Sequence, residues 1–408
     1  MLLALPALAF TLAAAVAADW PQWQGPDRTG ISKETGLLKT WPKDGPPLAW
    51  KVKGLGGGYT TPSVAQGRIY GMSYKGNEEV VWALNEADGK ELWNTKIAAK
   101  GQAGYNEGSR CSPTVDGDRV YVLGISSDVV CLDAASGKIL WQKNLKKDYA
   151  GKMMSGWGYS ESPLVDGDKL IVTPGGKDAS LVALNKKDGE LLWKAQVPQG
   201  DGAGYSSVIA ADVQGTRQYI QFMGRGVVGI AAADGKFLWR YDKPHNTTAN
   251  ISTPIYHDGH VFAGSGYGTG GGLAKLTKQA TGDFKADEVY FTKQMQNHHG
   301  GMVLVDGHIY GNNQGQLACI NFLTGEVKWN ERKPGKGSIA FADGHIYYRN
   351  EGGPIVLVEA NPKEYVEKGR FTQPDRSGKS AWPHPVIANG KLYILDQDLL
   401  LCYDIKQK

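Results

Sequence analysis

The sequence predicts an all-β fold, an eight-bladed β-propeller of four-stranded antiparallel blades. Three observations lead to this prediction. One segment recurs with a turn glycine followed four residues later by tryptophan, and a second segment alternates with it along the chain. The last repeat lacks a strand that the beginning of the chain supplies, so an N-terminal strand is expected to pair with the C-terminal blade and close the ring.

The first repeated segment is clearest between Ala83 and Trp93, as ALNEADGKELW. Further copies end at Trp141, Trp193, Trp239 and Trp329. A decayed copy, Thr281-Gly282 followed by Val289-Tyr-Phe291, fills the double-length gap before the last of them. The glycine supplies the positive φ that the turn needs. The tryptophan offers a large apolar surface, which we expect to wedge between neighbouring sheets.

The second segment is clearest as SPTVDGDRVYVLG, beginning at Ser112. Other copies begin at or near Thr61, Ser162, Ser207, Thr253, Gly301, Ser338 and His384. The copies lie about 46 residues apart on average. An Asp-Gly or Gly turn divides the first strand pair in each unit. A four-stranded sheet of roughly 45 residues, repeated around an axis, is the signature of a propeller blade.

The two ends of the chain predict how the ring closes. The eighth unit runs to Lys408 without a turn-and-tryptophan strand, and residues 47–52 precede the first unit with the missing sequence PLAWKV. Pairing the strand around Trp50 with the tail near Cys402 would complete the eighth blade and cover the sheet edges. The predicted domains are therefore a propeller over residues 47–408 and an N-terminal extension over residues 19–46.

Residues 1–18 are uncharged and apolar and end in small residues, which predicts a signal peptide and a periplasmic or secreted protein. The alternative is an uncleaved membrane anchor, although the stretch is short for a span. No later segment is apolar enough to cross a membrane. The net charge is only +4 and the basic residues are scattered, so we expect no nucleic-acid partner. The four cysteines lack metal-ligand spacing and are expected to be buried free thiols in a monomer.

The alternating motifs resemble the repeat of the pyrroloquinoline-quinone (PQQ)-like propeller family. The resemblance runs from about Trp50 to the C-terminus, and the segment from Asp19 to Gly30, DWPQWQGPDRTG, looks like the leader of exported members. The family includes quinoprotein alcohol dehydrogenases, which hold PQQ and calcium. It also includes the propeller of the outer-membrane assembly machinery, which binds protein. The resemblance therefore implies the fold and leaves the activity open.

Propeller ligands usually bind at the mouth of the central channel, on the loops that enter the innermost strands. The sequence places one residue of each blade at the same point before its first strand, and these positions are Tyr59, Arg110, Ser160, Tyr205, Ile251, His299, Lys336 and Trp382. Aromatic and cationic side chains dominate this set, which favours an anionic or planar ligand. The glycine-dense segment 264–272 is predicted to be a loop turn.

Two further segments carry candidate ligand-binding residues. In the first, Trp157, Tyr159 and Glu161 precede a first strand, and the Glu161 carboxylate is a candidate calcium ligand or a salt-bridge partner of Arg110. In the second, Asn297, His298 and His299 combine an amide with two imidazoles; His299 is a candidate metal ligand, a polar binding group or a structural residue. Adjacent side chains on an extended segment point in opposite directions, so we expect at most one of the two histidines to face the channel.

The sequence leaves two functions open. The favoured function is a binding scaffold that recognises a protein, glycan or small molecule at the channel mouth without catalysis. The alternative is a PQQ- and calcium-dependent dehydrogenase acting on an alcohol or sugar, with Glu161, Asn250, Asn297 and Trp157 around the quinone. The adjacent-cysteine disulfide typical of quinoprotein alcohol dehydrogenases and a Cys-x-x-Cys-His haem site are both absent from the sequence. No cofactor is therefore assigned, and PQQ with calcium is kept as part of the alternative.

Overall fold

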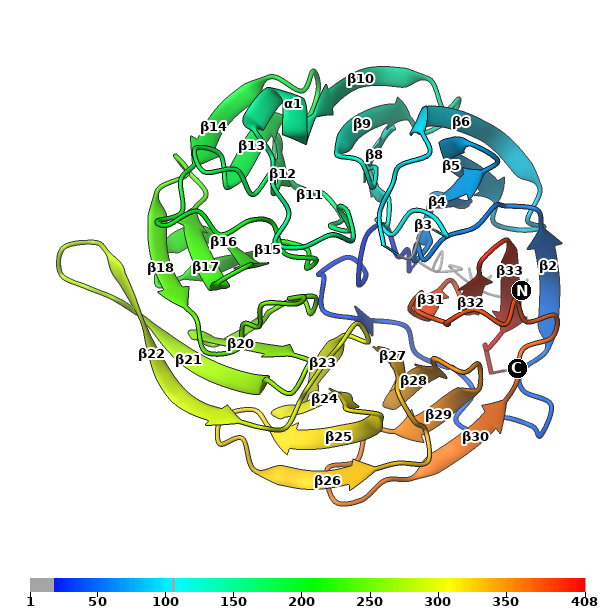
Figure 1. The fold of residues 1–408 in the computed structure, drawn as a ribbon. Helices are drawn as coiled ribbons and strands as arrows, with labels where there is room; N and C mark the ends of the chain where they lie inside the picture. The colour runs from blue at the N-terminus through cyan, green and yellow to red at the C-terminus, as the bar shows by residue number, and fades with distance from the viewer. Residues whose placement is uncertain (1–17, 105–106, 408) are drawn as a thin grey trace, which may run out of the picture.

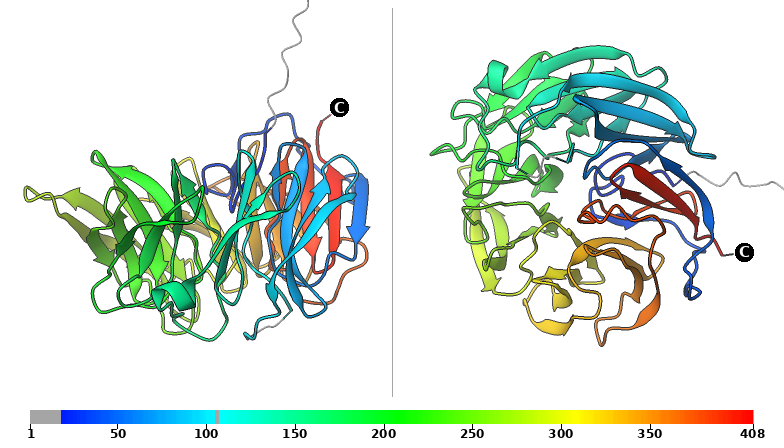
Figure 2. Two further views of the ribbon diagram at one scale, coloured as in Figure 1. Left: turned by 90° about the horizontal axis from the view of Figure 1, so that it is seen from above. Right: turned by 45° about the vertical axis from the view of Figure 1, so that its right-hand side comes forward.

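The computed structural model describes residues 18–104 and 107–407 and confirms the predicted eight-bladed propeller. Eight sheets stand around a central axis (Figure 1). The first six blades run outward in chain order, from an inner strand near the axis to an outer strand at the rim. The hairpin of the fifth blade projects beyond the ring, which is plain when the disc is seen from its edge (Figure 2).

Each of the first four blades is built from four strands that are consecutive in the chain. The first blade contains β3 (Ser63–Ala65), β4 (Arg68–Lys75), β5 (Glu78–Asn85) and β6 (Glu91–Ala99). The second contains β7 (Thr114–Asp116), β8 (Arg119–Leu123), β9 (Asp128–Asp133) and β10 (Ile139–Asn144), followed by helix α1 (Leu145–Tyr149). The third contains β11 (Leu164–Asp166), β12 (Lys169–Val172), β13 (Leu181–Asn185) and β14 (Leu191–Ala195). The fourth contains β15 (Ile209–Val213), β16 (Thr216–Met223), β17 (Gly226–Ala231) and β18 (Phe237–Tyr241).

The fifth and sixth blades are also built from consecutive strands, whereas the seventh and eighth each include a strand from the N-terminal part of the chain. The fifth blade contains β19 (Ile255–His257), β20 (His260–Ser265), β21 (Gly270–Lys278) and β22 (Phe284–Thr292). The sixth contains β23 (Met302–Val305), β24 (His308–Asn313), β25 (Gln316–Asn321) and β26 (Val327–Glu331). The seventh contains β27 (Gly337–Ala342), β28 (His345–Asn350), β29 (Ile355–Glu359) and β30 (Glu367–Phe371), with β1 (Ile31–Ser32) added. The eighth contains β31 (Val386–Ala388), β32 (Lys391–Asp396), β33 (Leu399–Asp404) and β2 (Leu48–Lys53).

The repeated tryptophan joins neighbouring blades as predicted, and the turn glycine is its partner. A β-carbon on Gly137 would lie 2.5 Å from the ring of Trp93 in the preceding blade, and Gly137 has a φ of 71°. Glycine is therefore needed there for both the turn and the close approach. The same pairing joins Trp50 with Gly89, Trp141 with Gly189, Trp193 with Gly235, and Tyr290 with Gly325.

Among the described residues, two tryptophans of the series make no such contact with a turn glycine of the next blade. Trp329 donates its indole N–H to the Asn361 carbonyl of the next blade at 2.9 Å. Trp239 lies over Gly229 of its own sheet and donates a hydrogen bond to Gln218 at 2.7 Å. In the decayed fifth repeat, a β-carbon on Gly282 would meet no atom within 4 Å. The degenerate turn therefore does not provide the contact that the other blades make with the preceding tryptophan.

The ring closes where the sequence predicts. Strand β2 pairs with β33 in antiparallel fashion, and Trp50 lies opposite Cys402. The four cysteines are buried and none forms a disulfide, which confirms that prediction. The predicted signal peptide lies almost wholly in residues 1–17, outside the described residues. In the part of the chain that the structure describes, no helix is long and apolar enough to cross a membrane.

The N-terminal extension crosses one end of the central channel (Figure 1). Its Trp20 pairs with Val64 of the first inner strand, and β1 then pairs in parallel with β27 at Phe341 and Ala342. Trp20 is only 2% exposed and belongs to the hydrophobic core. The extension is therefore packed inside the propeller, and it leaves the other end of the channel for a site.

Candidate functional site

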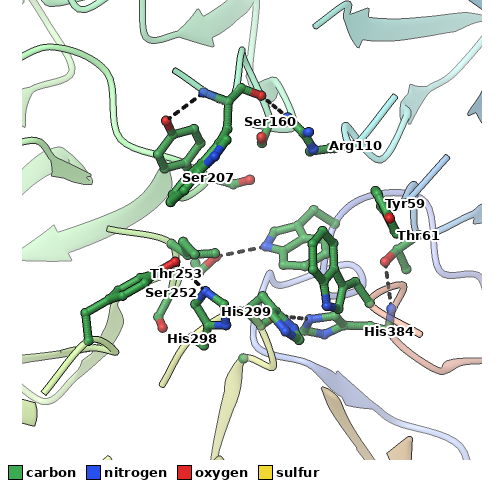
Figure 3. A pocket seen from close by; sticks show the side chains of 17 residues that line it. Tyr59, Thr61, Arg110, Ser160, Ser207, Ser252, Thr253, His298, His299 and His384 are labelled. Atoms are coloured by element: carbon green, nitrogen blue, oxygen red, sulfur yellow. Dashed lines mark hydrogen bonds between the residues drawn. The ribbon is translucent and has the colours of Figure 1, made fainter. Parts of the chain in front are cut away.

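A cavity of about 150 Å³ opens at the channel mouth, where the chain enters the innermost strands. The structure brings seven of the predicted ligand-binding residues to its lining, together with Ser160 and Ile251 from the ring of equivalent positions, and Figure 3 labels four of the seven. These seven are Tyr59, Arg110, Trp157, Tyr205, His298, His299 and Trp382. Several blades contribute because the loop before each first strand reaches the same axis.

Two groups of aromatic rings form much of the lining. In one, Trp157 lies 5.6 Å from Tyr205 and 6.5 Å from Tyr267 between ring centroids, and the Trp157 and Tyr267 planes differ by only 20°. In the other, Trp382 lies 4.3 Å from Tyr59 and 5.2 Å from His299. Flat rings of this kind suit a planar or apolar guest, because aromatic pairs stack or meet edge to face at these separations.

The sequence prediction missed two lining aromatics. Trp23 comes from the N-terminal extension; its indole N–H donates to the Thr253 hydroxyl at 2.8 Å, and its ring lies 4.6 Å from His384. Tyr267 lies in the glycine-dense turn 266–269 between β20 and β21. The repeat pattern contains no copy of either residue, so only the tertiary structure could place them at the cavity.

Both adjacent histidines line the cavity, and the prediction that at most one would do so is wrong. That prediction assumed an extended segment, whereas residues 298–300 form a bend. The His298 ring shares a hydrogen bond of 2.7 Å with the Tyr267 hydroxyl. The rings of His298 and His299 lie 4.7 Å apart between centroids.

Arg110 is the one side chain in the described lining that carries a charge at neutral pH. Its guanidinium donates to the carbonyls of Trp157 and Gly104, and burial lowers the pKa of Arg110 from the ordinary value of an arginine. Burial, together with the neighbouring His299, lowers the pKa of His298 to about 3. Burial also lowers the pKa of His384 to about 4. The imidazoles are thus neutral, and the cavity has a net positive charge from Arg110.

Glu161 does not reach the cavity. Its carboxylate is 2% exposed and accepts hydrogen bonds from the Thr173 amide at 2.8 Å and the Thr173 hydroxyl at 2.9 Å. Gln221 donates a longer bond of 3.4 Å. Burial raises the pKa of Glu161 to about 8, although the Thr173 hydrogen bonds and the charge of Arg28 lower it. The arginine that acts on this carboxylate is therefore Arg28 of the extension, and the predicted alternative of an Arg110 partner is not what the structure forms.

The remaining predicted residues lie behind the cavity wall and are bonded within the protein. The Tyr159 hydroxyl donates to the Pro174 carbonyl at 2.8 Å. The Asn250 amide donates to the Met223 carbonyl at 2.8 Å, and the Asn297 amide donates to a backbone carbonyl at 2.6 Å. All three side chains are at most 1% exposed. They hold the loops that carry the lining residues, and their role in binding a ligand stays a prediction.

The residues at the mouth do not fit a calcium–quinone pair. Calcium takes six to eight oxygen ligands, with carboxylates among them. In the described lining there is no aspartate or glutamate. Across residues 18–104 and 107–407, no group of three or more His, Cys, Asp or Glu side chains is placed to hold a metal. A cavity of about 150 Å³ matches one benzene-sized ring, whereas PQQ has three fused rings.

Comparison with known proteins agrees with the propeller and its repeats. The family model described as outer membrane protein assembly factor BamB matches residues 77–331. Among curated relatives, the BamB protein of Burkholderia pseudomallei is 25% identical over 268 residues, covering 62% of each chain. The protein of the same name from Shewanella oneidensis is 23% identical over 236 residues, covering 55% of this chain and 57% of the relative. The chain thus spans less than two thirds of the length of these relatives.

Solved structures show the same fold at low identity. BamB from Moraxella catarrhalis has a TM-score of 0.63 at 15% identity, covering 88% of this chain and 97% of its own. Quinohemoprotein alcohol dehydrogenase from Comamonas testosteroni has a TM-score of 0.69 at 14% identity, covering 96% of this chain and 81% of its own. These two likenesses establish the architecture and do not separate a binding protein from a dehydrogenase. The family match, which covers more than half of the sequence, shows that this chain belongs to the family described as outer membrane protein assembly factor BamB.

Proposed function

We propose that the protein is a periplasmic or secreted, non-catalytic scaffold that binds a partner through its central-channel mouth. The observation that supports this proposal most strongly is the composition of the mouth cavity. Its described lining combines aromatic rings, neutral imidazoles and one arginine, without a carboxylate. Such a surface can bind by stacking and hydrogen bonding, whereas a dehydrogenase needs a base beside the reacting carbon and a cofactor site.

The partner that we propose is an outer-membrane protein or a component that assembles one. This part of the proposal rests on the family, because the matched relatives are named outer membrane protein assembly factors. A rigid propeller also suits the role physically. Its blades interlock through the tryptophan–glycine contacts, so the mouth residues are held in place before a partner arrives.

A substitution that fills the mouth cavity tests whether the partner binds there or at the outer rim of the propeller. Ile251 lines the cavity, and Ile251→Trp would place an indole there. Val289 is 47% exposed on β22, so Val289→Trp adds the same group far from the lining. We expect Ile251→Trp to weaken binding of a urea-unfolded outer-membrane β-barrel protein by at least about ten-fold, since hot-spot losses exceed 1 kcal/mol. Fluorescence anisotropy with the labelled barrel protein measures this.

The Val289→Trp protein should bind the probe as the unmodified chain does. Equal affinity for all three proteins would show that the partner does not use the mouth. Absence of binding by the unmodified chain would show that an unfolded barrel protein is not its partner.

A further inference from the structure

We infer that the mouth cavity binds a single-ring compound that carries a carboxylate, held by Arg110 and a set of hydroxyl donors without a metal ion. This inference rests on the proposed function, because it names the chemical group that the mouth recognises. Three independent features of the cavity support it: its size and aromatic walls, its charge, and the direction of its hydrogen bonds.

The size and walls select one flat ring. A volume of about 150 Å³ corresponds to a cavity that holds one benzene-sized molecule. The rings of Trp157 and Tyr267 are nearly parallel, and Trp382 with Tyr59 forms the second aromatic group. A planar guest gains both apolar burial and ring stacking against such walls. Trp23 of the N-terminal extension adds a further aromatic ring to the lining.

The charge selects an anion. Arg110 is the charged group in the described lining, and the pKa values of His298 and His384 lie well below neutrality. The nearby Lys336 is paired with Glu351 at 3.0 Å, so these two charges largely cancel. The Glu107 carboxylate acts on Arg110 from outside the lining and is itself paired with Lys379 at 3.5 Å. A cationic ligand would be repelled by Arg110. A carboxylate would instead gain charge-assisted hydrogen bonds.

The hydroxyl groups of the lining point to the same chemistry. Thr61 accepts a hydrogen bond from the His384 amide at 2.9 Å, Ser207 accepts from the Ser162 amide at 3.0 Å, and Thr253 accepts from the Trp23 indole. A hydroxyl has one proton to donate in addition to its lone pairs. In the described part of the chain these three hydroxyls accept hydrogen bonds, and each also has a proton that it can donate to a carboxylate. Figure 3 shows the bonds that Thr61 and Thr253 accept.

All three hydroxyl-bearing residues are at most 5% exposed. A buried donor without an acceptor is costly, and a carboxylate oxygen would satisfy it. The cavity therefore combines stacking walls with a cation and buried donors. An amide or an amine on the same ring would satisfy this set less well, because an amide lacks the charge and an amine brings donors of its own.

Isothermal titration of the full chain with a matched ligand series tests the inference. The probes are phenylacetate, phenylacetamide, phenethylamine and acetate. We expect phenylacetate to bind at least about ten-fold more tightly than each of the others, the ratio that one charge-assisted hydrogen bond provides. The tripeptide Ala-Ala-Phe, with a free or an amidated terminus, then distinguishes a free aromatic acid from the end of a protein chain as the source of this group.

Two variants with the same loss of charge complete the test. Arg110→Gln should weaken phenylacetate binding by at least about ten-fold. Arg225→Gln should leave it unchanged, because Arg225 lies in a separate groove formed by the third and fourth blades. Equal affinity for phenylacetate and phenylacetamide, or for phenylacetate and acetate, would overturn the inference, and this comparison needs only the unmodified chain. Binding of the unfolded barrel protein is measured in a separate assay, so the ligand proposal can fail while the proposed function still holds.

Discussion

Each end of the central channel contains an arginine: Arg28 stabilises the packing of the blades, and Arg110 lines the mouth cavity. At the closed end, Arg28 is 4% exposed and donates to the carbonyls of Ser162 and Val208 at 2.9 Å and to that of Pro163. At the open mouth, Arg110 lines the cavity. Both arginines donate to backbone carbonyls, but Arg28 joins the inner parts of two blades, whereas Arg110 lines the cavity and its charge can act on a ligand there.

The two arginines differ in their surroundings, and this difference separates a structural cation from one that can bind a ligand. Burial lowers the pKa of Arg28 to about 10, and the neighbouring Glu161 acts in the opposite direction. A buried guanidinium whose hydrogen bonds go to fixed carbonyls stabilises the fold. The side chain facing a cavity is the one with a charge to offer to a ligand. Three predictions sharpen this contrast, beginning with the largest expected effect.

Truncating the two arginines should affect stability unequally. We expect Arg28→Met to lower the free energy of unfolding by about 3 kcal/mol or more, because it leaves several buried carbonyls without donors. Arg110→Met should cost about 1 kcal/mol, since fewer buried acceptors depend on it. Urea unfolding followed by circular dichroism measures both. Equal losses would mean that the closed end is no more dependent on its arginine than the mouth is.

The glutamates near the two ends should respond to pH in opposite directions. The pKa of folded Glu161 is raised to about 8, so its protonated form stabilises the fold at low pH and this contribution is lost as pH rises from about 4.5 to 8. For Glu351, burial raises the pKa while contacts with His299, Trp382 and Lys336 lower it, and the net direction is downward. Its contribution is therefore present at neutral pH and lost as pH falls toward its folded value.

We therefore expect Glu161→Gln to remove a decline in unfolding free energy of up to about 1.4 kcal/mol per pH unit between pH 5 and 8. Glu351→Gln should instead weaken the loss of stability below pH 5. Urea titrations at pH 4, 5, 7 and 9 give both slopes. If the Glu161→Gln protein showed the same decline as the unmodified chain, another group would be responsible for it.

The smallest expected effect concerns the floor of the cavity. Thr253→Val removes the acceptor of the Trp23 indole N–H and should cost about 1 kcal/mol of stability, the usual price of one unmade hydrogen bond. Phenylacetate should also bind more weakly, because a donor is lost. Thr216→Val is the control, since the Thr216 hydroxyl accepts only from exposed Lys278. Unchanged stability and affinity would place Trp23 outside the working cavity.

Much of the mouth could be predicted because the repeats place equivalent residues at equivalent points. Tyr59, Arg110, Tyr205 and Trp382 occupy the same position in four different blades, and all four line the cavity. Glu161 stood out by the same comparison, yet it lies one residue further along and turns toward Thr173. Position along a repeat thus predicts proximity to the axis, while the direction of a side chain depends on the loop around it.

The sequence by itself determined the number of blades, the turn glycines, the tryptophan contacts and the closing strand, because these depend on local patterns that recur at a constant spacing. The tertiary structure alone decided the path of residues 19–46 through the channel, the bend that turns His298 and His299 to the same side, and the burial of Glu161 beside Arg28. These features occur once, and they arise from packing between segments far apart in the chain. A repeat pattern carries no information about such contacts.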